Sequence, residues 1–508
     1  MNHAACTIML AAALAAQDPT AEWFANGAIP ELCITLDADA IESLRKEPRK
    51  FVRAELREDG TAPRRVAVKL KGSAGSFRGI DDRPGLTIDL RHVDGAGDFH
   101  GLVKFHLNNA VQDETLLHEA LAYEVFRRAG LPAPLVTHAR LRLGERDLGI
   151  YVLKEGYDER FALRHLGNAD GNLYDGGTNG EVHDDLQRDV TRGPEDRADL
   201  KALAAACAQR DAAARKRALA ACLDVDRFLT FMAVEVMIGH WDGYTLNPNN
   251  YRIWFDRDGR ATFVPHGTDQ VFEKADAELF RRPGGRVAQV VLADPEWRAA
   301  FRERMKQLLP LFAPPDGLIT WLRGREERLR KLTPGRDRQW RDLERRVAAR
   351  SRYLAEAVAR PEPQPFAVGK DGAALKDLPW RPETQCDDVV LERLDGDEPR
   401  LRLAAAGCGR CVGSFRAKVL LPQGRYELRS SMRMDGVVAF AEDGNRGPGV
   451  RISGGRRPGV HEGTGERALA FAFEIEDALR EVVLVVELRA AKGEAVFPLS
   501  GLHLVRVP

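Results

Sequence analysis

The chain has 508 residues, which is enough for two or three domains, and 44% of them are hydrophobic, which suffices for packed cores. It contains 76 Lys plus Arg and 76 Asp plus Glu, so its formal net charge at pH 7 is zero. With zero net charge, the chain has no overall electrostatic attraction to nucleic acid or to an anionic membrane.

An apolar stretch over residues 6–16 is the first feature along the chain. It is too short to span a bilayer as a helix, and Ala13 and Ala15 fit an Ala-x-Ala cleavage site. We therefore expect residues 1–16 to be a signal peptide, although only His3 stands where basic residues usually precede the apolar run. The expected location is secreted, periplasmic or cell-surface, and the alternative is a cytosolic protein without a signal. No other stretch resembles a transmembrane segment.

Alternating apolar and polar residues predict strands through most of the next 130 residues. A short helix is expected at residues 38–47, and an amphipathic helix at residues 114–130, which Gly130 and Pro132 end. This order of elements predicts an α+β fold. The expected strands cover residues 31–37, 50–57, 64–71, 86–91, 103–107, 135–143 and 147–153.

Helices dominate from Asp196 onward. Residues 196–222 are rich in Ala and Arg with helical periodicity, and residues 224–239 form an almost wholly apolar run, which is typical of a buried helix. Two strands are expected at residues 250–255 and 261–265. Helices are expected to resume at Trp297 and to continue to about Arg360.

A Pro-rich stretch, residues 361–367, reads as a linker, so a first domain is expected over residues 28–360. Short strand-like runs separated by Gly and Pro predict an all-β sandwich over residues 368–508. Cys408 and Cys411 have C-x-x-C spacing, but the second ligand pair of a zinc site is missing. A local disulfide or buried thiols are expected, with the connectivity open.

The loop after the apolar helix is the most informative part of the sequence. It reads His240-Trp-Asp-Gly-Tyr-Thr-Leu-Asn247, and the strand pair that follows ends at Val264-Pro-His-Gly-Thr-Asp269. Protein kinases arrange their catalytic loop and metal site in this order. Asp242 would accept the proton of an attacking hydroxyl. Alternatively, Asn-Pro-Asn-Asn is an ordinary turn, and the His only satisfies a helix end.

Residues 69–79 form a Gly-rich turn between two predicted strands. Backbone amides at Gly72 and its neighbours can cradle phosphates, although the turn lacks the Gly-Lys-Ser/Thr of a Walker A sequence. A hairpin turn that needs positive φ explains the glycines equally well. Glu155 follows another strand, where it can pair with a phosphate-binding base or lie at a sheet edge.

Seven segments, in order along the chain, resemble the CotH kinase family of atypical secreted or surface protein kinases. The resemblance covers roughly residues 30–275, with helices to about residue 360. The segments are residues 68–76, 107–113, 130–134, 148–155, 171–174, the Asp242 loop and residues 263–269.

By position, the resemblance implies a protein-kinase-like two-lobed fold that uses ATP and Mg²⁺. Two departures stand out: Gly267 replaces the first Asp of the family's Pro-Trp-Asp-x-Asp, and Lys71 and Arg83 stand where the family has Arg and Lys. The implied residues are Asp242 as catalytic group, Asn247 or Asn250 with Asp269 as metal ligands, and Lys71, Gly72, Arg83 and Glu155 around the nucleotide.

The function that these features predict is transfer of the ATP γ-phosphoryl group to Ser or Thr of a surface or coat protein. The alternative is a non-catalytic surface or envelope scaffold, a pseudokinase whose C-terminal sandwich binds carbohydrate or a protein. The departures at Gly267 and Arg83 are the features that favour this alternative.

Overall fold

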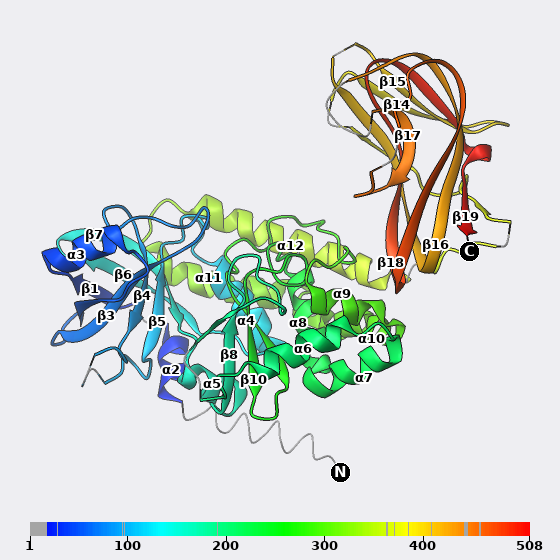
Figure 1. Cartoon of the computed structure of the whole chain (residues 1–508). Coiled ribbons are helices and arrows are strands. Elements are labelled where there is room, and N and C mark those ends of the chain that lie inside the picture. The colour runs from blue at the N-terminus through cyan, green and yellow to red at the C-terminus, as the bar shows by residue number, and fades with distance from the viewer. Residues whose placement is uncertain are drawn as a thin grey trace. The chain divides into compact units, whose positions relative to one another are not determined.

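The computed structural model describes residues 18–27, 29–93, 95, 97–189, 192–361, 364–369, 371–384, 386–407, 409–440, 446–456 and 459–507 (Figure 1). The predicted signal peptide, two residues of the predicted linker and Cys408 lie outside these ranges. The chain is a mixture of helices and sheets, which confirms the predicted α+β class. It divides into two compact units: the first ends at Arg360, and the second comprises the residues from Pro361 onward together with Ala293–Pro295.

Seven strands of the first unit close into a barrel in the order β1-β2-β3-β4-β5-β7-β6. Every strand predicted before residue 156 is present within a few residues of its expected bounds. A parallel pairing between β1 and β6 closes the barrel. The strands are β1 (Glu31–Thr35), β2 (Val52–Glu58), β3 (Arg64–Lys71), β4 (Gly85–Asp89), β5 (Lys104–Asn108), β6 (Val136–Leu143) and β7 (Arg146–Glu155).

Four helices accompany the barrel strands in sequence: α2 (Pro19–Asn26), α3 (Ala38–Lys46), α4 (His118–Arg128) and α5 (Glu159–Leu166). Helix α4 begins four residues later than predicted. The Asp113 carboxylate accepts hydrogen bonds from the backbone of Thr115 and His118, both at 2.9 Å, and so holds the preceding residues in a turn.

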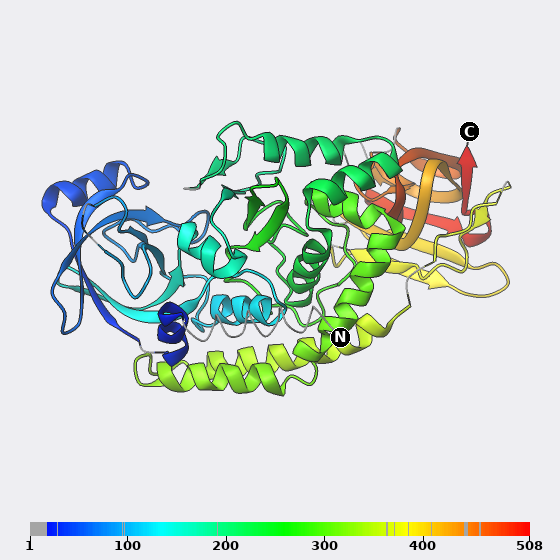
Figure 2. The same cartoon turned by 90° about the horizontal axis from the view of Figure 1, so that it is seen from below.

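A four-stranded sheet and seven helices complete the first unit (Figures 1 and 2). The sheet has the order β11-β10-β8-β9. Its strands are β8 (Gly171–Asp175), β9 (Gln187–Arg188), β10 (Tyr251–Asp256) and β11 (Ala261–Pro265). The helices are α6 (Ala198–Ala208), α7 (Ala212–Cys222), α8 (Val225–Met237), α9 (Arg286–Ala293), α10 (Pro295–Leu308), α11 (Asp316–Arg330) and α12 (Asp337–Ala359), with a 3₁₀ turn, η1 (Leu309–Leu311).

Two helix predictions need correction. Residues 196–222 form two helices rather than one, because the Asp211 side chain accepts a hydrogen bond from Ala214 N at 2.7 Å and starts α7 anew. Helices also resume at Arg286 rather than at Trp297. The apolar helix at 224–239 is confirmed as α8, and all of its residues from Phe228 to Met237 are buried.

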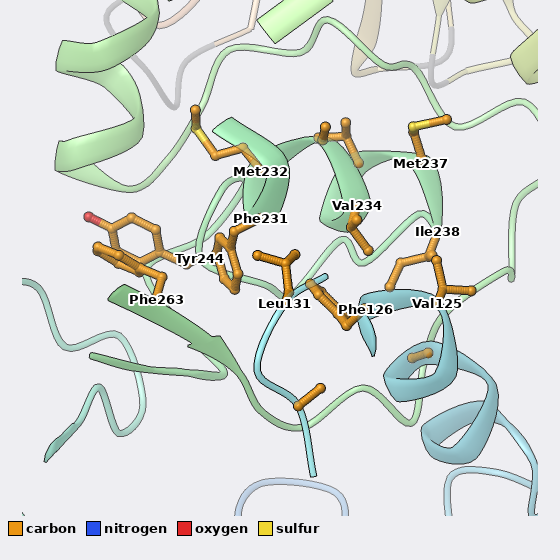
Figure 3. Close-up of a cluster of buried hydrophobic side chains, with 14 of the residues drawn as sticks. Val125, Phe126, Leu131, Phe231, Met232, Val234, Met237, Ile238, Tyr244 and Phe263 are labelled. Carbon is orange, nitrogen blue, oxygen red and sulfur yellow. The ribbon is translucent and has the colours of Figure 1, made fainter. Parts of the chain in front are cut away.

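Helix α8 lies at the centre of the largest apolar core of the first unit. Its side chains pack against those of α4, of strand β11 and of the loop that follows α8 (Figure 3). Glu235, within this apolar helix, is fully buried and therefore needs hydrogen-bond partners. The packed residues in the close-up are Val125, Phe126, Leu131, Phe231, Met232, Val234, Met237, Ile238, Tyr244 and Phe263.

The second unit is all-β, with its own apolar core. Six strands follow the order β12-β19-β16-β18-β15-β14, while β13 pairs with β16 and β17 with β18. Cys411 is disulfide-bonded. The strands are β12 (Ala373–Ala374), β13 (Arg381–Thr384), β14 (Val389–Leu394), β15 (Arg400–Ala405), β16 (Cys411–Ala439), β17 (Gly447–Ile452), β18 (Gly463–Pro498) and β19 (His503–Val507), with a 3₁₀ turn, η2 (Leu499–Gly501).

Within the described ranges, none of the helices combines the length and the apolar character that a membrane crossing requires.

Candidate functional site

Two buried side chains, Glu235 and His240, hold the loop that follows α8. The Glu235 carboxylate accepts hydrogen bonds from Thr245 N at 2.8 Å, Thr245 Oγ1 at 2.6 Å and Tyr244 N at 3.2 Å. His240 Nδ1 lies 3.4 Å from Glu235 Oε1, and His240 Nε2 lies 3.1 Å from the carbonyl oxygen of Gly267. The loop is therefore tied both to its own helix and to the segment after β11.

Asp242 sits half-buried on this loop, and Asn250 is its partner. Asn250 Nδ2 donates to Asp242 Oδ2 at 2.7 Å and to the Asp242 carbonyl oxygen at 3.0 Å. Asn249 Nδ2 donates to the same carboxylate oxygen at 3.0 Å. Asn247 instead donates to the carbonyl oxygen of Trp241 at 2.7 Å. The structure therefore brings Asn250, and not Asn247, to the Asp242 carboxylate.

Gly267 leaves the space that Asn250 occupies. A Cβ at Gly267 would lie 2.2 Å from Asn250 Oδ1, well inside van der Waals contact, and the glycine has a φ of +53°. Any side chain at this position would displace the Asn250 amide or strain the backbone. The replacement of the family's Asp by Gly is thus accompanied by an Asn packed directly against it.

Asp269 is held at its backbone by α4 and is half-buried. His118 Nδ1 lies 2.9 Å from the Asp269 carbonyl oxygen. Burial raises the pKa of the Asp269 carboxyl, the nearby Glu119 carboxylate raises it further, and Lys154 and Lys71 lower it less. This carboxylate thus lacks enough positive charge nearby to offset its loss of water.

A buried ion pair joins the barrel to α4. Lys154, at the end of β7, is 1% exposed, and its Nζ lies 2.7 Å from Glu119 Oε1 in the first turn of α4. Burial lowers the pKa of Lys154, but the Glu119 carboxylate, together with Tyr157 and Asp269, more than offsets that effect and raises it. Lys154 Nζ also donates to the Tyr123 hydroxyl at 3.3 Å.

Lys71, the last residue of β3, extends this network. Its Nζ donates to Asn108 Oδ1, and Asn108 Nδ2 in turn donates to Glu119 Oε2. Burial and the nearby Lys154 charge lower the pKa of Lys71 to about 7. The two lysines therefore lie close enough to repel, which is an arrangement that an anionic ligand would stabilise.

Gly72 begins the Gly-rich turn directly after Lys71, with a φ of +112°. Arg49 donates to the carbonyl oxygens of Leu70 and Gly72 and so anchors the start of the turn. Asn109 Nδ2 donates to the Ser76 carbonyl oxygen at 3.1 Å and anchors its end.

The structure does not bring the side chains of Arg83 and Glu155 into this network. Arg83 Nη2 donates to the Ile150 carbonyl oxygen at 2.6 Å, and its guanidinium lies over the Tyr151 ring. Glu155 forms ion pairs with Arg164 and with His165. Because successive residues of a strand point to opposite faces, Glu155 faces away from the side of β7 on which Lys154 meets Glu119.

Sequence reasoning missed Lys154 and Glu119, although a signal existed. Lys154 directly follows the buried apolar run Ile150–Leu153 of β7, and Glu119 is buried in the first turn of the amphipathic helix α4. Charged residues at buried positions are almost always paired. The residue that pairs with a lysine of this site is thus Glu119 on α4 rather than Glu155.

The oxygen donors of this region suit a hard cation. Asp242, Asn250 and Asp269 offer carboxylate and amide oxygens, which Mg²⁺ prefers. Among the residues that the structure describes, no group of three or more His, Cys, Asp and Glu is placed to hold a metal ion. Mg²⁺ at this site would therefore depend on an Asn ligand and on oxygens of the nucleotide.

Comparison with known proteins identifies the family. Residues 85–358, more than half of the chain, match the CotH kinase protein family, so the chain belongs to it and the predicted resemblance is confirmed. The chain is also 24% identical over 233 residues to inner spore coat protein H of Bacillus subtilis (strain 168). That match covers 42% of this chain and 63% of the relative, which is less than two thirds of its length.

Two solved structures match the chain at low similarity. TmCBM61 in complex with β-1,4-galactotriose is 17% identical, with 25% of this chain and 89% of that chain covered and a TM-score of 0.19. The enzymatically active domain of tailspike protein 4 from bacteriophage CBA120 is 9% identical, with 28% of this chain and 21% of that chain covered and a TM-score of 0.20.

Proposed function

We propose that this protein is a kinase that transfers the γ-phosphoryl group of ATP to a Ser or Thr hydroxyl of another protein. The observation that carries the proposal is the hydrogen-bonded network of half-buried Lys71 and Asn108 with buried Glu119 and Lys154, with Asp269 beside it. Phosphoryl transfer needs positioned positive charge around the phosphates more than it needs a covalent intermediate. The two lysines supply that charge.

Each remaining residue has a role in this proposal. Asp242 accepts the proton of the attacking hydroxyl, and the Asn250 amide orients the Asp242 carboxylate. Asp269 and Asn250 would hold Mg²⁺, which when bound neutralises charge on the phosphates. The Gly-rich turn after Lys71 presents backbone amides to the same phosphates.

The finer architecture and location belong to the same proposal. The barrel and the helical part of the first unit would be the two lobes of a kinase-like domain spanning residues 28–360. Residues 361–367 would be a linker to a β-sandwich accessory domain. We also propose a secreted, spore-coat or cell-surface location with a coat or surface protein as substrate, and the similarity to inner spore coat protein H supports the spore-coat case.

For the accessory domain we propose binding of a carbohydrate or of a protein partner. Among the described residues of this unit, the exposed large apolar side chains are those of Val390, Val438 and Val460, while Phe366 and Phe473 are partly buried.

Calorimetric titration with Mg·ATP tests nucleotide binding. We expect the wild type to bind and Lys71→Ala to bind about 10- to 100-fold more weakly, because one charge-assisted hydrogen bond is lost. Lys306→Met, on the exposed face of α10, is the matched control and should bind like the wild type. No binding of millimolar nucleotide by the wild type would refute the proposal and favour the scaffold alternative.

A further inference from the structure

The segment between β11 and α9 has no regular secondary structure over residues 266–285. Segments at this position of a phosphotransferase are commonly ordered by phosphorylation, through arginines that pair with the new phosphate. Here the segment contains a single hydroxyl side chain, Thr268, which is fully buried. The segment therefore presents no accessible hydroxyl for such a switch.

Arg350 of α12 occupies the place where this segment meets the end of α8. Its guanidinium is fully buried and donates to four carbonyl oxygens. Two belong to the last turn of α8, Val236 at 2.6 Å and Met237 at 2.9 Å. The other two belong to the segment, Ala275 at 3.1 Å and Ala277. One side chain thus joins the helix that ends beside Asp242 to the chain that follows Asp269.

The electrostatics of Arg350 fit this double role. Burial lowers its pKa to about 10, while Tyr353 and the Asp276 carboxylate raise it less. Its direct hydrogen-bond partners are carbonyl oxygens, and two of them lie at the negative end of the α8 dipole. A guanidinium presents five donors in a rigid fork, so Lys would reproduce the charge but not the four contacts.

Further contacts hold the same segment along α8 and α12. Arg346, one turn before Arg350 on α12, donates to the Phe272 carbonyl oxygen at 3.2 Å. Phe272 N donates to the Ile238 carbonyl oxygen at 2.8 Å, and Phe272 has a φ of +55°. Val271 and Leu279 are buried in the apolar core.

We propose that Arg350 and Arg346 are positioning residues that hold the Asp242 loop and residues 270–279 in one permanent arrangement, so the site is assembled without phosphorylation of this segment. The claim that this arrangement serves catalysis rests on the proposed kinase function. The claim that the two arginines hold the arrangement does not, so experiments can test the positioning and the kinase function separately.

Amide hydrogen exchange on the full chain tests the positioning. We expect Arg350→Lys and Arg346→Gln to raise exchange about tenfold in peptides covering residues 236–243 and 270–279, the equivalent of about one lost hydrogen bond. Exchange in barrel strands β1 to β4 should stay unchanged. Arg345→Gln, an exposed neighbour on α12, is the control and should match the wild type throughout.

Two outcomes of the exchange measurement would overturn the proposal. Unchanged exchange at both sites in both variants would show that the arginines position nothing. Exchange that rises equally in the barrel would show a general structural role.

Activity with Mg·ATP, and with casein as the acceptor probe, is the second measurement. The variants should have a lower kcat while KM for ATP stays near the wild-type value. Phosphatase treatment of the wild type should not lower its activity. Loss of activity on phosphatase treatment would refute the permanent assembly, whereas an inactive wild type would refute only the kinase function.

Discussion

Lys71 and Lys154 have neighbouring ammonium groups whose pKa values shift in opposite directions. Lys154 has a carboxylate partner, Glu119, at 2.7 Å, which keeps it charged despite burial. Among the described residues, the hydrogen-bond acceptor of Lys71 is the neutral amide of Asn108, and burial and repulsion by Lys154 lower the pKa of Lys71 to about 7. Lys71 is therefore the group whose charge depends on what is bound.

This difference predicts pH-dependent nucleotide binding. Below pH 7 Lys71 is charged and attracts phosphate, whereas above pH 7 it is increasingly neutral, so the affinity for Mg·ATP should fall as the pH rises from 6 to 8. Arg stays charged throughout this range, so Lys71→Arg should show a flatter profile. Calorimetry at several pH values measures both proteins, and the variant corrects for ionisation of the nucleotide. Identical profiles would contradict the assignment to Lys71.

The sequence left open whether Asn247 or Asn250 is the candidate metal ligand near Asp242. Both lie at plausible spacings from Asp242, but Pro248 and the positive φ of Asn250 turn the chain between them. The direction of a side chain in such a turn depends on the φ and ψ of each residue, which spacing does not specify. The packing of Asn250 against Gly267 depends on where a second segment of the chain lies, so the sequence could not predict it either.

Strand β7 and helix α4 show how elements set the charges of the site. Alternation along β7 places Lys154 and Glu155 on opposite faces, and α4 supplies the carboxylate that Lys154 needs. The sequence predicted both elements from their apolar periodicity. It did not predict which charged residue of each would meet the other, because that requires the relative placement of helix and barrel.

Glu119→Gln should destabilise the first unit by about 3–5 kcal/mol, since it leaves the Lys154 charge buried without a counterion. Urea denaturation followed by circular dichroism measures this change in free energy of unfolding. Glu124→Gln lies on the same helix and removes half-exposed pairs with Arg127 and Arg128, so it should cost less than about 1 kcal/mol. Equal effects of the two substitutions would show that the Lys154–Glu119 pair has no special role.

For the whole molecule, local pattern predicted most elements but not the closed barrel. Barrel closure requires β1 to pair with β6, about a hundred residues later in the chain, and such pairing leaves no trace in local alternation. Within the barrel, the successive pairings β3–β4, β4–β5 and β5–β7 bring Lys71, Asn108 and Lys154 to one region of the wall. The spacing of polar residues pointed to the Asp242 loop and Asp269, and the family resemblance supported that assignment.

The most direct test of the kinase account is transfer of labelled γ-phosphate from Mg·ATP to casein as a Ser/Thr acceptor. The account predicts transfer by the wild type and by Asp258→Asn, a control in the exposed turn after β10. It predicts a loss of about 10²- to 10⁴-fold in Asp242→Asn, which keeps the shape of the side chain but cannot accept the proton. Equal transfer by Asp242→Asn and the wild type would contradict the role of Asp242, and no transfer by any of the three would contradict the kinase function.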